Sequence, residues 1–258
     1  MKTVAIIPAR YGSTRLPGKP LIEIKGKTLI QYVYERIQAS SVQQVIVATD
    51  DERIASVVRS FGGETVLTSP QHRSGTERVA EVAAAIDAPI VVNCQGDEPL
   101  IQPEAIDQAI AAFAQDPSIV VTTLIAPLEN SADLYNPHVV KVVVDHEGFA
   151  LYCSRAPIPY PRNILEQAGE NSGNEIELIK NLEKKDLIGY WQHIGLYAFR
   201  REFLQQLTTL PPTPLEEQEK LEQLRILENG YKIKTVVCST PSIGIDTPED
   251  IERFKSLL

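Results

Sequence analysis

The sequence predicts an α/β fold with a mostly parallel sheet and helices on both of its faces. Short β-branched apolar runs alternate with longer segments of helical periodicity through roughly the first 115 residues. Gly- and Pro-rich loops separate them. Four successive strand–helix units of this kind are typical of a parallel sheet that is covered by helices on both sides.

The expected elements can be placed in chain order. Strands are expected at residues 4–7, 44–48, 64–67 and 89–94, and helices are expected after Thr28, at Thr49-Asp50, near Gly75 and at Pro103. The later chain is predicted to contain strands at 119–125, 139–144, 149–154, 194–199 and 232–238, and helices at 214–229 and from Pro248. The pair of strands around 145–148 reads as a hairpin.

The pattern becomes strand-rich near residue 118, and the polar stretch 162–189 is expected to be a partly helical excursion. We therefore predict a larger domain formed by residues 1–130 and 200–258. A smaller subdomain, residues 131–199, is inserted in it.

Composition restricts the class of function. The 258 residues include 34 acidic and 25 basic side chains, a net charge of −9, which argues against a nucleic-acid partner. No apolar run approaches the roughly 20 residues of a membrane span. The three cysteines are scattered without zinc spacing, and the cation-rich opening is unlike a secretory signal. A soluble, cytoplasmic protein is expected.

The loop after the first strand carries three cations, Arg10, Arg15 and Lys19, punctuated by glycine and proline. Loops at the carboxyl ends of strands are where an α/β sheet binds ligands. Cations and close backbone N–H groups there favour a highly charged anion such as a triphosphate, although a solvated basic loop is the alternative. The candidate contacts are Ala9, Arg10, Gly12, Ser13, Arg15 and Lys19.

Two aspartates are candidate Mg²⁺ ligands. Asp97 follows the strand at 89–94, so it should reach the same sheet edge as the opening loop, and Asp246 follows a late strand. Mg²⁺ binds few protein oxygens and keeps phosphate and water as its other ligands. Asp246 could instead cap the final helix, a role for which Thr247 competes.

Other polar residues are candidates for contacts with an uncharged part of a ligand. Ser74 and Gly75 could hold a base or a ribose, or could simply begin a helix. In the second half, Arg155 could meet a carboxylate. Glu216, Glu219 and Gln223 share a helical face beside Glu222, a set suited to sugar hydroxyls but also typical of a solvated face. His193 could equally be a structural residue.

Several common catalytic motifs are missing. Lys19 is followed by Pro20, so the Walker lysine motif is absent, and no GxGxxG follows a strand. The sequence also has neither GxSxG nor HExxH. P-loop hydrolysis, hydride transfer and esterase chemistry therefore have no support.

Together, several motifs resemble those of the 3-deoxy-manno-octulosonate (Kdo) cytidylyltransferases, in the same order from residue 4 to about 255. They are IIPARYGSTRLPGKPL, VATDD, HRSGTER, VNCQGDEP, NPHVVKVV, YCSRAPIPY, HIGLYAF, PLEEQEKLEQLR and GIDTPED. The opening motif is shared by sugar-acid cytidylyltransferases in general, whereas HRSGTER and PLEEQEKLEQLR are more specific. The excursion at 162–189 is longer than is usual in this family.

The resemblance implies a Rossmann-like nucleotidyltransferase fold of the GT-A type, Mg²⁺, a homodimer and a place in lipopolysaccharide synthesis. It implies that the 2-hydroxyl of Kdo attacks the α-phosphorus of CTP. The larger domain would bind the nucleotide, and the smaller one would serve the sugar and the dimer. In this picture Arg10, Arg15 and Lys19 hold the triphosphate, Asp97 and Asp246 hold the metal, and Ser74, Gly75 and Gln95 lie near the nucleoside. Gln95, Arg155, His193, Glu222 and Gln223 meet Kdo.

Three alternatives stay open at this point. Another sugar-acid cytidylyltransferase, such as a CMP-sialate synthetase, shares the opening loop. A nucleotide-sugar glycosyltransferase would usually carry Asp-x-Asp, where this chain has Gly96-Asp97-Glu98. A non-catalytic nucleotide-binding module would not need both the three cations and the two acids.

Overall fold

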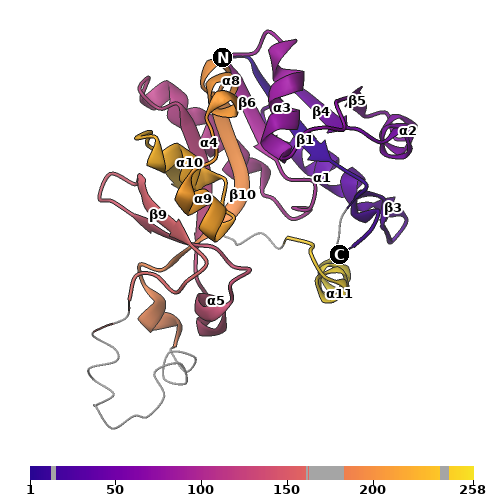
Figure 1. Ribbon diagram of the computed structural model, residues 1–258. Coiled ribbons are helices and arrows are strands. Elements are labelled where there is room, and N and C mark those ends of the chain that lie inside the picture. The colour runs from indigo at the N-terminus through magenta and orange to yellow at the C-terminus, as the bar shows by residue number, and fades with distance from the viewer. Residues whose placement is uncertain (13–15, 161, 163–182, 239–243) are drawn as a thin grey trace. The chain divides into compact units, whose positions relative to one another are not determined.

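The computed structural model describes residues 1–12, 16–160, 162, 183–238 and 244–258 (Figure 1). The chain divides into two compact units. Unit 1 comprises Met1–Thr122, Gly195–Leu210 and Ser242–Leu258, and unit 2 comprises Thr123–Ile194 and Pro211–Pro241. The predicted division differs mainly at 211–241, which the sequence pattern assigns to the larger domain. These residues fold in unit 2 because the helix at Gln223–Glu228 packs on a strand of that unit.

Unit 1 is built on parallel strands in the order β5, β4, β1 and β6, and the second half of β10 runs antiparallel to β6. The bounds of these strands are β1 Thr3–Ala9, β4 Gln44–Thr49, β5 Glu64–Leu67, β6 Ile90–Cys94 and β10 Trp191–Arg200. Short strands β2 (Glu23–Ile24) and β3 (Lys27–Thr28) pair separately. The mostly parallel sheet agrees with the prediction.

The two central strands explain why short apolar runs were a reliable signal. Every residue of β1 and of β6 is buried, as expected for strands that are covered on both faces. β1 and β6 pair in parallel with Ile6 opposite Asn93. The loops that leave Ala9 and Cys94 therefore emerge at the same edge of the sheet.

Helices cover this sheet on both faces (Figure 1). Helix α1 packs against α4, and α3 packs against α8. The helices of unit 1 are α1 Leu29–Gln38, α2 Glu52–Ser60, α3 Gly75–Ala84, α4 Pro103–Gln115, α8 Arg201–Thr209, α11 Pro248–Leu257 and the 3₁₀ turn η1 Lys19–Leu21. The expected starts near Thr28, Gly75, Pro103 and Pro248 are confirmed. Helix α2 begins slightly later than expected, because Asp51 caps it by accepting from the N–H of Arg53.

Unit 2 contains the strand-rich segment. Strands β8 and β9 form the expected hairpin, in which Asp145 Oδ1 accepts from the N–H groups of Glu147 and Phe149. The elements of this unit are α5 Ser131–Tyr135, β8 Lys141–Val144, β9 Ala150–Ser154, η2 Lys184–Leu187, α9 Pro214–Glu219, α10 Gln223–Glu228 and β11 Lys234–Val237. Strand β7 (Val121–Pro127) and strand β10 contribute residues to both units. Helices α5 and α8 were not expected from the sequence.

The single helix predicted at 214–229 is wrong. The structure has two short helices, α9 and α10, separated at Lys220, whose φ of 54° is left-handed. The guanidinium of Arg155 donates to the carbonyl oxygens of Glu219 and Lys220, at 2.8 and 3.4 Å. Arg155, which is far from this segment in the sequence, thus binds the backbone carbonyls at the end of α9, where the sequence pattern predicts that the helix continues.

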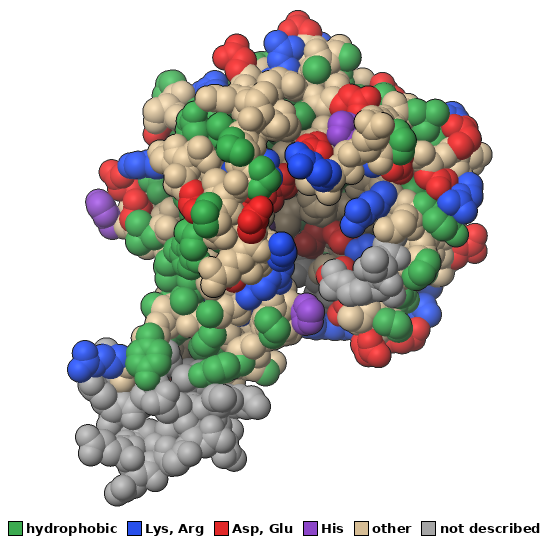
Figure 2. Space-filling model, viewed as in Figure 1, with side chains coloured by type: hydrophobic (Ala, Val, Ile, Leu, Met, Phe, Trp, Pro, Cys, Tyr) green, Lys and Arg blue, Asp and Glu red, His purple; other side chains and the backbone are tan. Residues whose placement is uncertain are grey.

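Most of the excursion predicted at 162–189 lies outside the described residues. Within the described part of the chain, no helix has both the length and the apolar character needed to cross a membrane. On the face shown in Figure 2, acidic and basic side chains are intermingled and form no continuous basic surface.

Candidate active site

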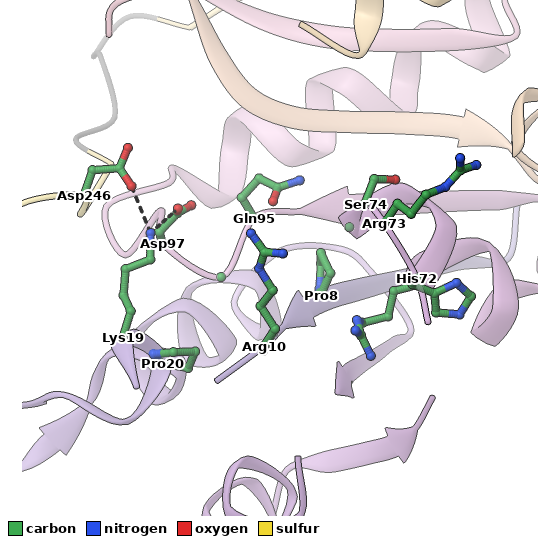
Figure 3. Close-up of a pocket in the computed structure, with 14 residues that line it drawn as sticks. Pro8, Arg10, Lys19, Pro20, His72, Arg73, Ser74, Gln95, Asp97 and Asp246 are labelled. Carbon is green, nitrogen blue, oxygen red and sulfur yellow. Dashed lines mark hydrogen bonds and ion pairs between the residues drawn. The ribbon is translucent and has the colours of Figure 1, made fainter. Parts of the chain in front are cut away.

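A pocket in unit 1 lies at the sheet edge where β1 and β6 end (Figure 3). Its described lining includes four Lys or Arg side chains and two Asp side chains, in a protein of net charge −9. The lining residues with ionisable side chains are Arg10, Lys19, His72, Arg73, Arg78, Asp97 and Asp246. Pro8, Ala9, Pro20, Ser74, Gly75, Gln95 and Gly96 complete the described lining. The excess of cations makes this pocket suited to an anionic ligand.

Lys19 lies between the two predicted metal ligands (Figure 3). Its Nζ donates to Asp97 Oδ2 at 2.6 Å and to Asp246 Oδ1 at 3.0 Å. Burial by itself would lower the pKa of Lys19, but the two carboxylates outweigh it and the pKa is raised. The ammonium therefore stays charged, and residues from three distant parts of the sequence meet around it.

Hydrogen bonds that do not involve Lys19 also hold the backbone around these two aspartates. The N–H of Ile245 donates to the carbonyl of Asp97 at 2.9 Å, which ties the two loops together. Thr247 is the N-cap of α11, with its side chain accepting from the N–H of Asp250. The cap role considered for Asp246 therefore belongs to Thr247, and the Asp246 carboxylate turns to Lys19.

The start of α3 forms another part of the pocket. Ser74 Oγ accepts from the N–H of Glu77 at 3.2 Å, so Ser74 is the helix N-cap as well as a lining residue. A Cβ at Gly75 would lie 3.1 Å from Pro8 Cγ and 3.6 Å from Gln95 Oε1. This close packing explains why glycine suits the position. The positive end of the helix dipole adds to the attraction for an anion.

Gln95 is placed by a buried polar chain. Its Nε2 donates to Asn93 Oδ1 at 3.4 Å, and Asn93 Nδ2 donates to Thr76 Oγ1 at 3.3 Å. Asn93 is fully buried on β6, and Thr76 lies in the first turn of α3. These bonds connect the lining amide to the helix start on the neighbouring side of the pocket.

Three lining residues with ionisable side chains were not predicted from the sequence, although the motif HRSGTER contains all of them: His72, Arg73 and Arg78. Arg78 is buried, with its guanidinium bound to Asp50 at 2.8 Å and to Thr68 Oγ1. His72 forms a hydrogen bond with Glu81, and this bond is the largest of the effects that lower the pKa of the Glu81 carboxyl. A run of cations beside a helix start was the signal that could have identified them.

Part of the predicted triphosphate loop cannot be placed. Ser13 and Arg15 lie outside the described residues, whereas Ala9, Arg10 and Lys19 line the pocket. Gly12 is exposed and is not among the lining residues. Tyr11 is held in the same loop: its ring lies 3.4 Å from Arg53 Cζ, and its carbonyl accepts from the N–H of Gly18.

Of the five candidates for the sugar, Gln95 lines the pocket in unit 1, and the other four lie in unit 2. Each nitrogen of the Arg155 guanidinium donates to a backbone carbonyl: Nε to Glu219, Nη1 to Pro137 and Nη2 to Lys220. Glu219, which shared a predicted face with Glu216 and Gln223, accepts from Ser154 Oγ at 2.6 Å. These contacts give Arg155 and Glu219 structural roles within unit 2.

The remaining candidates of unit 2 lie close to the buried strand residues. His193 Nε2 is 2.8 Å from Thr123 Oγ1, and burial lowers the pKa of His193 to about 4. Gln223 is buried at the start of α10, directly after the half-buried Glu222. Burial raises the pKa of the neighbouring Cys153 thiol to about 12, opposed by a hydrogen bond with Gln223. Because its pKa is about 4, His193 is neutral at physiological pH.

The donor set at Lys19 suits a hard cation. Among the described residues, no group of three or more His, Cys, Asp or Glu side chains could hold a metal ion. Two carboxylates alone suit Mg²⁺, which commonly uses one or two carboxylates together with substrate phosphates and water. Oxygens of Asp97, Asp246 and the Ile245 carbonyl already converge on one cationic atom, the Lys19 Nζ, at 2.6–3.0 Å.

Comparisons with known proteins agree with this geometry. A family model described as cytidylyltransferase matches residues 4–233. The 3-deoxy-manno-octulosonate cytidylyltransferase of Syntrophotalea carbinolica is 51% identical over 259 residues, covering 100% of this chain and 99% of the relative. That of Geotalea daltonii is 50% identical, covering 98% of this chain and 96% of the relative.

A solved structure of CMP:2-keto-3-deoxy-manno-octonic acid synthetase in complex with CTP superposes with a TM-score of 0.87 at 42% identity. The match covers 100% of this chain and 98% of that chain. The inositol-1-phosphate CTP transferase of T. maritima, at 15% identity and a TM-score of 0.66, shares the fold. The matched family model and the full-length relatives show that the chain belongs to the 3-deoxy-manno-octulosonate cytidylyltransferase family.

Proposed function

We propose that this protein transfers CMP from CTP to the anomeric 2-hydroxyl of Kdo, releasing pyrophosphate and giving CMP-Kdo for lipopolysaccharide synthesis. The observation that carries the proposal is the convergence of Lys19, Asp97 and Asp246 at the edge of a cation-lined pocket. Full-length relatives that are about half identical to this chain support the choice of reaction.

The cations hold the triphosphate. In-line displacement at phosphorus depends mainly on positioning and charge neutralisation, and little on covalent help from the protein. Arg10 and Lys19 line the pocket, and Arg15 belongs to the same loop. In the proposed reaction they bind phosphate oxygens and offset the charge that grows on the departing pyrophosphate.

Asp97 and Asp246 are the proposed ligands of Mg²⁺. The convergence of their oxygens on an ammonium shows a site already arranged around positive charge. When bound, Mg²⁺ would neutralise phosphate charge and lower the pKa of the attacking hydroxyl, so a side-chain base is not required. The two aspartates are proposed to hold the ion, and Gln95, which lines the same pocket, is proposed to contact both substrates.

Asp97→Asn tests the metal assignment. The variant should fold, because the Asp97 carbonyl still accepts from Ile245, but it should lose nearly all turnover at any Mg²⁺ concentration. Circular dichroism checks the fold and pyrophosphate release measures turnover. Substantial Mg²⁺-dependent activity in Asp97→Asn would reject the assignment.

The nucleoside is proposed to lie against Ser74, Gly75 and Gln95, where a small base fits the close backbone. A Cβ at Gly75 would press on Pro8, so backbone and not a side chain lines the pocket here, and a ligand can approach that backbone closely. On the sugar side, His193, Glu222 and Gln223 are proposed to bind hydroxyls of Kdo. Arg155 is proposed to serve its carboxylate, with the donors that its backbone contacts leave over.

We also propose a homodimer and a cytoplasmic location. Leu151, Tyr160 and Ile188 lie in the smaller subdomain, residues 131–199, that is expected to serve the dimer, and they are 62%, 61% and 85% exposed. A partner copy would cover them, and sedimentation equilibrium at micromolar concentration measures the state, a monomer being the contradicting result. All three cysteines are free, which suits a reducing compartment.

The reaction is tested by pyrophosphate release from CTP and Mg²⁺ with Kdo, with N-acetylneuraminate, or with no sugar. Release with Kdo alone is expected. Release only with N-acetylneuraminate would favour a CMP-sialate synthetase, which the opening loop also fits. Release without sugar would indicate hydrolysis, and its absence in every arm would contradict the proposed activity.

A further inference from the structure

All three protons of the Lys19 ammonium are used inside the protein. Nζ donates to Asp97 Oδ2 at 2.6 Å, to the Ile245 carbonyl at 2.9 Å and to Asp246 Oδ1 at 3.0 Å. An ammonium has three donors and no more. In this arrangement Lys19 cannot bind a phosphate without giving up one of these oxygens.

The same oxygens are those that a hard divalent cation takes as ligands. Mg²⁺ needs carboxylate oxygens at about 2.0–2.1 Å. An ammonium that already lies within 3.0 Å of both carboxylates would be within a few ångströms of such an ion. Two cations at that distance repel strongly, because the Lys19 side chain is only 14% exposed and solvent screens it weakly. The ammonium and the metal therefore compete for one place.

The parts of the site differ in their freedom to move. The Asp97 and Asp246 loops are tied by the bond from Ile245 N–H to the Asp97 carbonyl, and Asp246 N–H donates to Asp250 at 3.0 Å. The Lys19 backbone is fixed in η1, where the N–H of Leu21 donates to Gly18. The flexible part is the four-carbon stem of the Lys19 side chain.

We propose that Lys19 is an internal counter-cation for the metal site. It holds the Asp97 and Asp246 carboxylates together before the metal binds, and it moves to the triphosphate when the metal takes its place. Metal binding and nucleotide binding are thereby coupled through one side chain. This inference rests on the proposed function, because it uses the metal and the triphosphate assigned there.

In the protein without nucleotide, Lys19 and the metal compete for the same oxygens. Neutralising Lys19 should increase metal affinity without nucleotide, although the same change removes a phosphate ligand. Loss of a competing charge-assisted interaction corresponds to a gain of about tenfold or more. If Lys19 were only a phosphate ligand, its removal would leave metal affinity in the free protein unchanged.

Binding of Mn²⁺, a paramagnetic substitute for Mg²⁺, is measured by electron paramagnetic resonance on the full chain without nucleotide. Lys19→Met should bind Mn²⁺ at least about tenfold more tightly than the wild type. The matched control is Lys27→Met. Lys27 is also paired with a carboxylate at 2.6 Å, but it lies outside the pocket lining. The control variant should therefore bind Mn²⁺ like the wild type. In the double variant Lys19→Met/Asp97→Asn the gain should disappear.

Equal or weaker Mn²⁺ binding by Lys19→Met overturns the inference, as does a gain that persists in the double variant. Lys19→Gln and the rise in Tm with added Mn²⁺ provide a second test, since the rise should exceed that of the wild type. Failure of the proposed function is seen separately, as absence of pyrophosphate release by the wild type with CTP and Kdo. That assay is independent of the Mn²⁺ measurements.

Discussion

Arg155 and Glu219 bind each other reciprocally at the end of strand β9. Nε of Arg155 donates to the Glu219 carbonyl at 2.8 Å, and Oε2 of Glu219 accepts from the backbone N–H of Arg155 at 3.0 Å. Glu219 is the last residue of α9, directly before the left-handed Lys220. The pair therefore stabilises the break that lets α10 begin at Gln223.

Arg155→Ala should lower both stability and sugar recognition. It removes three bonds to backbone carbonyls, and a charged hydrogen bond contributes roughly 1.5–3 kcal/mol. We expect a lower Tm together with a raised KM for Kdo, and little change in KM for CTP. The matched control is Arg200→Ala in unit 1, whose guanidinium also binds two backbone carbonyls, of Ile119 and Pro117. The control should lower Tm without affecting KM for Kdo, and equal effects on Kdo would contradict the prediction.

Gly18 should be intolerant of a side chain. Its φ of 68° is left-handed, and a Cβ would lie 3.1 Å from the Tyr11 ring. Gly18→Ala should displace the loop that carries Arg10 and Lys19, raising the Kd for CTP about tenfold, as measured by calorimetry. Gly26→Ala is the control, with φ of 84° and nothing within 4 Å. Both variants should lose about 1–2 kcal/mol of unfolding free energy, because alanine is strained in the left-handed backbone region. Unchanged CTP affinity in Gly18→Ala would reject a role for the packing of Gly18 against Tyr11.

Asp50→Asn should destabilise unit 1 by leaving the Arg78 guanidinium buried without its carboxylate. The Arg78 side chain is 5% exposed and that of Asp50 is 22% exposed. We expect a loss of roughly 1.5–3 kcal/mol in urea unfolding, the value of a charged hydrogen bond. Glu252→Gln, which breaks an exposed pair with Lys255, should cost less than about 1 kcal/mol. Equal losses would show that burial of Arg78 adds nothing.

His193 should make the protein sensitive to acid. Its pKa in the folded protein is about 4, below the ordinary value of 6.5, so the unfolded chain takes up the proton first. The contribution of His193 to the free energy of unfolding is therefore complete above pH 6.5. It is lost as pH falls toward 4, by at most about 1.4 kcal/mol per pH unit. His193→Gln should show a shallower fall in Tm between pH 6.5 and 4, whereas the exposed His138→Gln should follow the wild type. Parallel curves of Tm against pH for the wild type and both variants would contradict this role of His193.

Local sequence predicted the longer elements of unit 1 other than α8, and it predicted the sheet edge that carries the pocket. Short β-branched runs such as Val4–Ile7 are buried on both faces, and loops that follow parallel strands necessarily emerge at one edge. This brought Lys19, Asp97, Ser74 and Gln95 into one pocket, as expected. Arg78 was missed because its partner, Asp50, follows a different strand.

The features that only the tertiary structure decides depend on contacts between residues far apart in the chain. The periodicity at 214–229 favours one helix, but Arg155 binds the carbonyls where the helix breaks, and those bonds are invisible to a local pattern. In the same way, the sequence predicts that Lys19 is a phosphate ligand. Its position between Asp97 and Asp246, 78 and 227 residues away, depends on how three loops meet. Local propensity specifies the elements, whereas the partner of a buried charge is specified by the fold as a whole.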